Sequence, residues 1–179
     1  MSKSIYSGQV PARPVVYFRD DGDSPAPVGG QQRAHAQDRL PGPEGSEQYC
    51  YSLEPPTGVA VRAGQIADPR RPIVVSADVG PDLIEPWRKP SLVILYTKHV
   101  IDPADLKLVS ALGAHDANVI VRLPDDRSVF PFAALTAQVR GNEVPLADPL
   151  QQIWDLQDLG GADRLEAAGR LRQWLLARH

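Results

Sequence analysis

Apolar residues in this chain occur in short runs separated by polar stretches, and these runs predict a small sheet. The longest run, Leu92–Tyr96, is unbroken and rich in aliphatic residues. Such a run predicts a strand buried on both faces. Shorter runs bounded by Pro, Gly or turn residues predict further strands over residues 57–61, 72–76, 118–123, 134–140 and 144–146.

Two Asp-Pro pairs mark the expected starts of helices. Asp102 and Asp148 can each cap a helix, and the Pro that follows each one suits the first helical position. The first helix is expected to run towards Gly113. In the second, Leu150, Ile153 and Trp154 share one face, and Gln151 has the spacing of a capping box. Both segments are therefore predicted to be amphipathic helices.

A second C-terminal helix is predicted after the Gly160–Gly161 pair. Asp163 and Glu166 have the spacing of a reciprocal cap. Its expected buried stripe consists of Leu165, Ala168, Leu171 and Leu175, with Trp174 on its shoulder. Short helices joined by glycines are typical of a helical hairpin. We therefore expect an α/β or α+β fold, with a small mixed sheet and a C-terminal helical hairpin.

The N-terminal part of the chain has a different composition. Between Gly22 and Gln48 the only large apolar residues are Val28 and Leu40, which is too few to offset the entropy of ordering the segment. We therefore expect residues 1–48 to be a flexible, disordered segment, with one short strand at 15–18. Residues 49–179 are expected to form a single mixed α/β domain.

Charge and cysteine content narrow the functional classes. The chain has 19 basic and 22 acidic residues, so its net charge of −3 does not favour nucleic acid, although a local basic face is compatible with it. The longest apolar run is too short to cross a membrane. The single cysteine, Cys50, excludes an internal disulfide and suits a reducing cytoplasm. We therefore expect a cytoplasmic protein.

The residues that could carry catalysis are scattered. His35, His99, His115 and His179 lie far apart, without a Cys, Glu or His at ligand spacing, so we expect neither a metal site nor a cofactor. Cys50 has no nearby histidine and is expected to be structural. Trp154 and Trp174 are expected to belong to the core rather than to an interface. The sequence therefore predicts no catalytic residue.

Residues 90–179, about half of the chain, resemble the C-terminal domain of the AbiEi family, antitoxin-like transcriptional regulators of type IV toxin–antitoxin systems. The resemblance lies in Leu92–Tyr96 and in Asn118–Pro124, which Val129–Phe130 follow. It is strongest at Val144–Gln151 with Asp155–Leu156. Glu166–Ala168 and a closing helix rich in Leu and Arg complete it.

This resemblance implies a bacterial, non-catalytic regulator that pairs with a protein partner, a nucleotidyltransferase-like toxin. Family members carry an N-terminal winged helix, but the first fifty residues here show no helical periodicity that could supply one. We expect the exposed arginines Arg164, Arg170 and Arg172 to contact the partner. One alternative is a DNA-binding transcriptional regulator that uses a basic surface. The second is a small hydrolase or nucleotidyltransferase relative using His115, Asp125 and Asp126.

Overall fold

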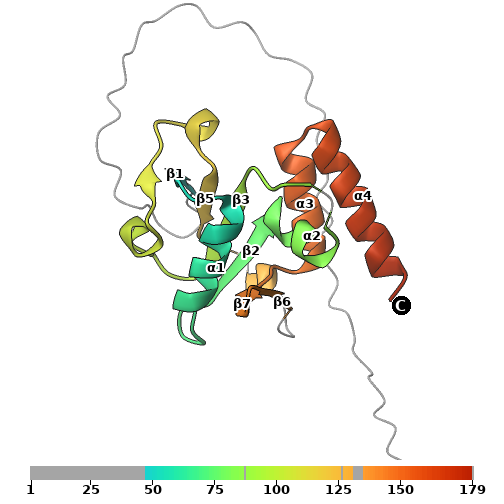
Figure 1. Ribbon diagram of the computed structural model, residues 1–179, viewed down its shortest axis with the longest axis horizontal. Coiled ribbons are helices and arrows are strands. Elements are labelled where there is room, and N and C mark those ends of the chain that lie inside the picture. The colour runs from blue at the N-terminus through green and yellow to red at the C-terminus, as the bar shows by residue number, and fades with distance from the viewer. Residues whose placement is uncertain (1–46, 87, 126, 131–134, 179) are drawn as a thin grey trace, which may run out of the picture. The chain divides into compact units, whose positions relative to one another are not determined.

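A five-stranded mixed sheet with helices against both faces forms the centre of the domain (Figure 1). The computed structural model describes residues 47–86, 88–125, 127–130 and 135–178. The strand expected at 15–18, and the flexible segment expected at 1–48 except for its last two residues, lie outside this range. The prediction of a mixed sheet with a C-terminal helical hairpin is confirmed.

The sheet has the strand order β2-β3-β5-β1-β4. The central pair β3–β5 is parallel, and the other three pairs are antiparallel. All five residues of β3 are buried, as its unbroken apolar run predicts. The strands are β1 (Glu47–Tyr51), β2 (Ile73–Ala77), β3 (Val93–Thr97), β4 (Val109–Ser110) and β5 (Val119–Arg122). A separate hairpin consists of β6 (Thr136–Val139) and β7 (Asn142–Pro145).

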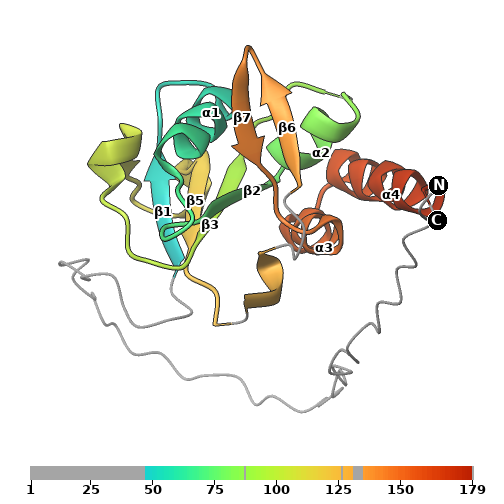
Figure 2. The same cartoon turned by 90° about the horizontal axis from the view of Figure 1, so that it is seen from below.

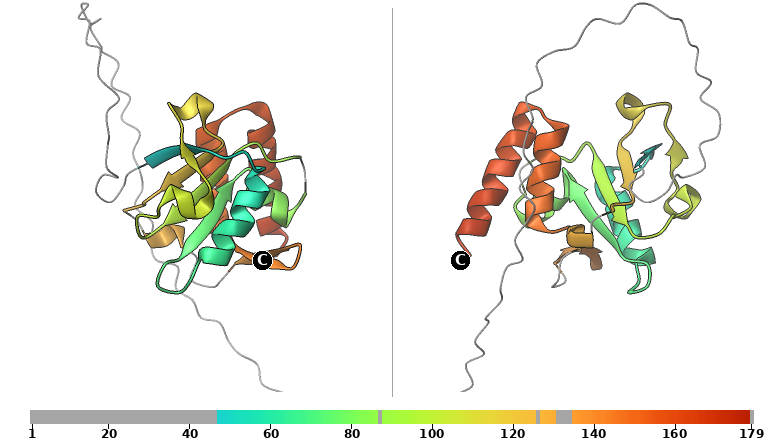
Figure 3. Two further views of the ribbon diagram at one scale, coloured as in Figure 1. Left: turned by 60° about the vertical axis from the view of Figure 1, so that its left-hand side comes forward. Right: turned by 180° about the vertical axis from the view of Figure 1, so that it is seen from behind.

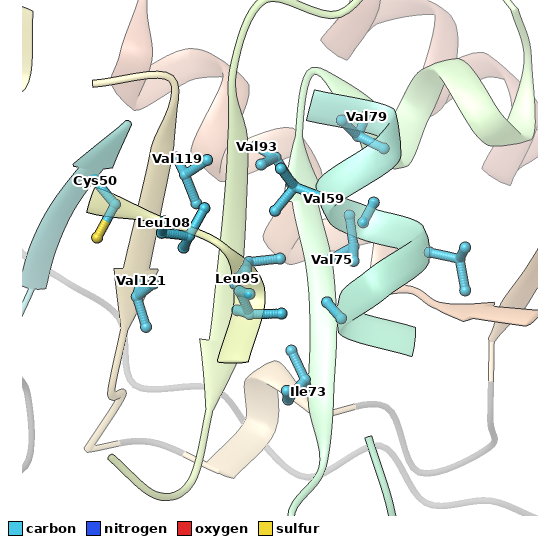
Figure 4. Packing of buried hydrophobic residues seen from close by; sticks show 14 of the residues in the cluster. Cys50, Val59, Ile73, Val75, Val79, Val93, Leu95, Leu108, Val119 and Val121 are labelled. Atoms are coloured by element: carbon cyan, nitrogen blue, oxygen red, sulfur yellow. The ribbon is translucent and has the colours of Figure 1, made fainter. Parts of the chain in front are cut away.

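One face of the sheet packs against α1 (Pro56–Ile66). Val59, Ala60 and Ala63 are buried on the helix, and Val75 and Leu95 are among the strand residues that meet them (Figure 4). The strand predicted at residues 57–61 is therefore wrong. Pro56 begins a helix there, and the i, i+4 spacing of the buried residues outweighs the β propensity of the short Val-containing run.

The other face of the sheet packs against α3 (Pro149–Leu159), which turns at Gly160 and Gly161 into α4 (Ala162–Leu176). Figure 2 shows α1 and α3 on opposite sides of the strands, and Figure 3 shows α3 and α4 side by side. Both glycines have positive φ, +68° and +93°, as the predicted glycine stop requires. No helix among the described residues has the length and apolar character needed to cross a membrane.

The Asp148 cap is confirmed, because its side chain accepts a hydrogen bond from the Leu150 N–H (2.9 Å). The Asp102 cap also forms, but the helix after it is a four-residue 3-10 turn, Pro103–Leu106. Lys107 adopts a left-handed conformation (φ +54°) and ends it, and β4 follows, so the helix predicted to reach Gly113 is wrong. A short helix, α2 (Val79–Ile84), follows β2 and contacts α4.

The close approach of α1 to β7 gives a test of the packing. A Cβ at Gly64 would lie 2.3 Å from the backbone oxygen of Glu143, so Gly64→Ala should lower the free energy of unfolding by about 1–3 kcal/mol. Gly169→Ala in α4 is the matched control. Its Cβ would meet nothing within 4 Å, and the change should raise stability by about 0.5–1 kcal/mol. Urea unfolding measures both, and a Gly64→Ala variant as stable as the wild type would contradict this packing.

Candidate functional site

A buried carboxylate, that of Asp155 in α3, lies between this helix and the sheet. Its side chain is 0% exposed. Four polar side chains surround it, Ser76 of β2, Tyr96 of β3, Arg122 of β5 and Gln151 of α3. We refer to these five residues as the Asp155 cluster.

Strand register explains why three strands supply side chains to one carboxylate. Tyr96 and Arg122 are direct partners in the parallel β3–β5 pair. Val74 is the partner of Tyr96 across β2–β3, and Ser76 lies two residues further along the same strand. Side chains two residues apart on a strand project from the same face. Ser76, Tyr96 and Arg122 therefore all face α3.

Both oxygens of the Asp155 carboxylate accept hydrogen bonds. The Tyr96 hydroxyl donates to Oδ1 at 2.6 Å, and the Gln151 amide and an Arg122 Nη atom donate to it at 3.0 and 3.1 Å. The Ser76 hydroxyl donates to Oδ2. Gln151 and Arg122 also donate to the Tyr96 oxygen. Gln151 therefore bonds within the cluster, and its predicted role in a capping box is wrong.

Burial dominates the electrostatics of the cluster. It raises the pKa of the Asp155 carboxyl, although hydrogen bonds from Ser76, Tyr96 and Gln151 and the charge of Arg122 act in the opposite direction. Burial and the neighbouring Asp155 also raise the pKa of the Tyr96 hydroxyl. A carboxylate that is fully buried and accepts bonds from three strands is suited to fixing α3 in place on the sheet.

Arg122 extends the cluster towards the surface. Its side chain is 13% exposed; its Nε atom lies 2.6 Å from a Glu47 oxygen, and an Nη atom lies 3.6 Å from Asp158. Through Arg122 the cluster connects α3 to β1 at the start of the described chain. No local residue pattern predicts that these five side chains meet.

A second buried carboxylate, Asp78, fixes α4. The Asp78 side chain is 5% exposed, and Arg164 of α4 donates to both of its oxygens, at 2.7 and 3.2 Å. Burial alone would raise the pKa of Asp78, but hydrogen bonds from Arg164 and Ser91 lower it below the usual value. Arg164, predicted to be an exposed contact residue, is thus an internal partner of Asp78.

The space between α2 and α4 is small. A cavity of about 20 Å³ lies there, which is room for a single water molecule. Arg170, another predicted contact residue, lines it and also pairs with Glu166 one turn earlier at 3.3 Å. Asp163 pairs with Arg88. The reciprocal cap predicted for Asp163 and Glu166 is therefore wrong, and Gly161 occupies the N-cap.

The opposite side of the helical hairpin carries exposed apolar side chains. Trp154 is 54% exposed and Leu150 47%, and on α4 Leu165 and Leu176 are 55% and 71% exposed. Arg172, the third predicted contact residue, is also exposed, and no interaction partner is found for it among the described residues. We name Leu150, Trp154, Leu165, Arg172 and Leu176 the outer hairpin surface.

Helical spacing places this surface away from α2. On α3, Gln152 packs on Gly80 of α2, and Trp154 lies about 200° around the helix from it. On α4, Arg164 and Leu171 line the cavity between α2 and α4. Leu165 and Arg172 come one residue after them, so each is rotated by about 100° around the helix from a cavity-lining residue. Both helices thus turn their remaining apolar residues to the same exposed side.

Part of the predicted core of the hairpin is therefore wrong. Ala168 and Leu171 are buried with Ile153 and Leu156, and Trp174 and Leu175 are partly buried against them. Leu150, Trp154 and Leu165, which were also expected inside, are exposed. The apolar stripe on each helix is wider than the part of it that packs against the other helix or the sheet. The remaining apolar residues of each stripe are therefore exposed.

The residues of the catalytic alternative do not come together. His115 lies before the start of β5 and Asp125 after its end, both exposed, and Asp126 lies outside the described residues. His99 donates from its Nε2 to the Arg70 backbone oxygen (3.0 Å). Cys50 is buried in the sheet, and this burial raises the pKa of its thiol. Within the described ranges, no group of three or more His, Cys, Asp or Glu side chains could hold a metal ion.

Two open grooves flank the turn between β1 and α1. One, of about 510 Å³, runs along α1 towards Arg140 and Asn142, and the other, of about 400 Å³, lies beside Leu53 and Lys107. Glu54 borders both. It forms an ion pair with Arg62 at 2.5 Å, so the acidic group that the grooves share is already neutralised. Their lining does not select a ligand class.

The Asp155 cluster can be tested by truncation. Asp155→Ala should lower the free energy of unfolding by about 3–5 kcal/mol, because Arg122 loses its buried counter-charge and the Ser76 hydroxyl loses its acceptor. Asp158→Ala is the control; Asp158 is exposed and more distant from Arg122, so the loss should be below about 1 kcal/mol. Equal losses in urea unfolding would show that Asp155 does not fix α3.

The Asp78–Arg164 pair predicts a pH dependence. Arg164→Met should cost about 1–3 kcal/mol at neutral pH, because it leaves the buried Asp78 carboxylate without its cationic partner. Since the folded-state pKa of Asp78 is lowered, the pair stabilises the fold above the ordinary Asp pKa, and this contribution disappears as the pH falls through the folded-state value. The cost of the substitution should therefore shrink in acid.

The matched control for this pair is Arg88→Met. Arg88 pairs with Asp163 of α4, the helix that also carries Arg164. Both side chains of this pair are well exposed, so the loss of Arg88 should cost below about 1 kcal/mol. Urea unfolding of both variants at pH 7 and near pH 3 provides the comparison. A cost for Arg164→Met that is the same at both pH values would argue against a charged Asp78 as the partner.

Comparisons with models of protein families, with curated proteins and with solved structures gave no match to this chain. The resemblance to AbiEi-type regulators accordingly stays a prediction.

Proposed function

We propose that this chain is a cytoplasmic, non-catalytic protein-binding domain that contacts its partner through the outer hairpin surface. The exposure of Trp154 carries the proposal. A tryptophan that is half exposed on one side of a helix, with leucines beside it, is typical of the centre of a protein interface.

The composition of the surface supports this function. Scattered exposed leucines are common on any protein, whereas clustered apolar residues with a Trp and an Arg are enriched at interfaces. Leu150 lies one turn from Trp154 on α3, and Leu165 and Arg172 lie two turns apart on the exposed side of α4. Together they offer an apolar centre with a cationic rim.

The interior of the domain supports it as well. The Asp155 cluster holds α3 on the sheet, and Asp78 holds α4 through Arg164. Both helices are thus fixed before a partner arrives, so binding does not have to order them. A pre-organised surface loses less conformational entropy on association.

The resemblance to AbiEi-type regulators implies the same class of function. Tyr96, Arg122, Gln151 and Asp155 all belong to the segments on which that resemblance depends, and all four meet in the Asp155 cluster. Pairing with a nucleotidyltransferase-like toxin is one form that protein binding through this domain would take. The DNA-binding alternative gains no support from Arg164, because Asp78 neutralises it.

Site-specific photo-cross-linking in native cells tests the proposal. Benzoylphenylalanine in place of Trp154 should give a cross-linked adduct with a protein, because the side chain would be buried in the interface. The same group in place of Leu112, which is fully exposed on the sheet side of the domain, is the control and should give none. Absence of an adduct at position 154, or equal adducts at both positions, would reject the outer hairpin surface as the binding site.

A further inference from the structure

We infer that the partner of the outer hairpin surface is a different protein, which contributes an amphipathic helix with an acidic edge. This helix packs along α4 and comes closest to it at Gly169. The inference rests on the proposed function, because it assumes that the outer hairpin surface binds protein. It follows from a glycine without an internal role, from the face that α4 exposes and from the charge of that face.

Gly169 lies in the middle of α4, where the domain itself does not require a glycine. Its backbone is helical, unlike that of Gly160 and Gly161, whose φ values are positive. A Cβ at Gly169 would contact nothing within 4 Å. A glycine inside a helix is destabilising relative to alanine. Its other structural use is to let a second molecule approach the backbone closely, and at this position that molecule has to come from outside the domain.

The open position at Gly169 belongs to the exposed face of α4. Four residues fall within about 60° of one another around this helix, namely Leu165, Gly169, Arg172 and Leu176. The two leucines are 55% and 71% exposed, so α4 presents a gap between two apolar side chains. Counted from the glycine turn at about 1.5 Å per residue, Trp154 lies about 10 Å along α3 and Gly169 about 13 Å along α4. The tryptophan is therefore nearly level with the gap.

A helix suits this surface better than a strand. The backbone N–H and C=O groups in the middle of α3 and α4 are paired within each helix, so neither helix offers an edge to which a strand could be added. Recognition therefore depends on side chains. Helices pack on one another by placing the ridges of one into the grooves of the other, at axial distances of about 8–10 Å. The shortest distances occur where a residue has no side chain, which is the reason for placing the closest approach at Gly169.

The charge of the surface favours an acidic partner. Arg172 is the charged member of the outer hairpin surface. The acidic side chains Glu166 and Asp158 of the same two helices are engaged elsewhere, because Glu166 pairs with Arg170 and Asp158 is turned towards Arg122. The surface is therefore cationic, although the whole chain has a net charge of −3. A carboxylate on the partner helix would complement Arg172. A second copy of this chain would instead bring another cationic surface.

Cross-link mapping with the full chain in native cells tests the inference. Benzoylphenylalanine replaces Leu165 in one variant and Leu176 in another, and mass spectrometry identifies the partner residue that each one modifies. The two positions lie about 16 Å apart along α4. A helix packed along α4 spans that distance in about eleven residues, whereas an extended strand spans it in about five. We expect a separation near eleven, with an acidic residue between the two modified positions.

Filling the gap is the second test. In a chain that carries benzoylphenylalanine at position 154, Gly169→Leu should lower the yield of the adduct at least about tenfold, because the added side chain holds the partner helix away from α4. Leucine favours a helix more than glycine does, so the variant should be at least as stable as the wild type in urea. Gly113→Leu is the matched control. Its Cβ would also meet nothing within 4 Å, and the yield should be unchanged.

The charge of Arg172 is tested in the same way. Arg172→Glu should lower the adduct yield, because it places a carboxylate opposite the acidic edge of the partner helix. Arg172→Gln, which removes the positive charge without reversing it, should lower the yield less. An adduct yield that Arg172→Glu leaves unchanged would contradict an acidic partner.

A separation near five residues, modified positions in unrelated segments, or adducts with another copy of this chain would overturn the inference. An unchanged yield for Gly169→Leu would overturn it as well. In each of these cases an adduct at position 154 leaves the proposed function standing. If position 154 gives no adduct with any protein, the proposed function is wrong and the inference is wrong with it.

Discussion

The hydrogen bonds that the Asp155 carboxylate accepts from three strands determine how this domain is built. A charge without exposure to water is stable only where donors surround it, so α3 has to lie where Ser76, Tyr96 and Arg122 can all reach it. A buried network of this kind contributes less to net stability than its number of bonds suggests, because each group loses water on folding. Its larger effect is to exclude other positions of the helix.

The position of α3 in turn determines the exposed surface of the domain. The glycine turn connects α3 directly to α4, and Arg164 holds α4 against Asp78 on the α2 side. With the hairpin attached on two sides, only its remaining side can carry Trp154 and its leucine neighbours. The polar interior and the apolar exterior of the hairpin are therefore two consequences of one arrangement, in which rigid positioning leaves a surface suited to binding protein.

The features that depend on local rules could be predicted from sequence. The aspartate cap before Pro149, the glycine turn and the buried strand at residues 93–97 are examples, because neighbouring residues decide them. The prediction of a strand at residues 57–61 fails because burial against a sheet that is distant in the sequence overrides β propensity. The Asp155 cluster depends on strand register, which residue patterns do not specify. Its one local signal is an acidic residue between Ile153 and Leu156 on the buried side of α3.

Native-state hydrogen exchange measures directly whether the hairpin is fixed to the sheet. If the Asp155 cluster couples them, the amides of Gln152–Leu156 in α3 should exchange only through the same global opening as those of Ile94–Tyr96 in β3. The two segments would then share one free energy of opening and one dependence on denaturant. Exchange of the α3 amides by a separate opening several kcal/mol cheaper than that of β3 would contradict the account, because the hairpin would then move independently of the strands.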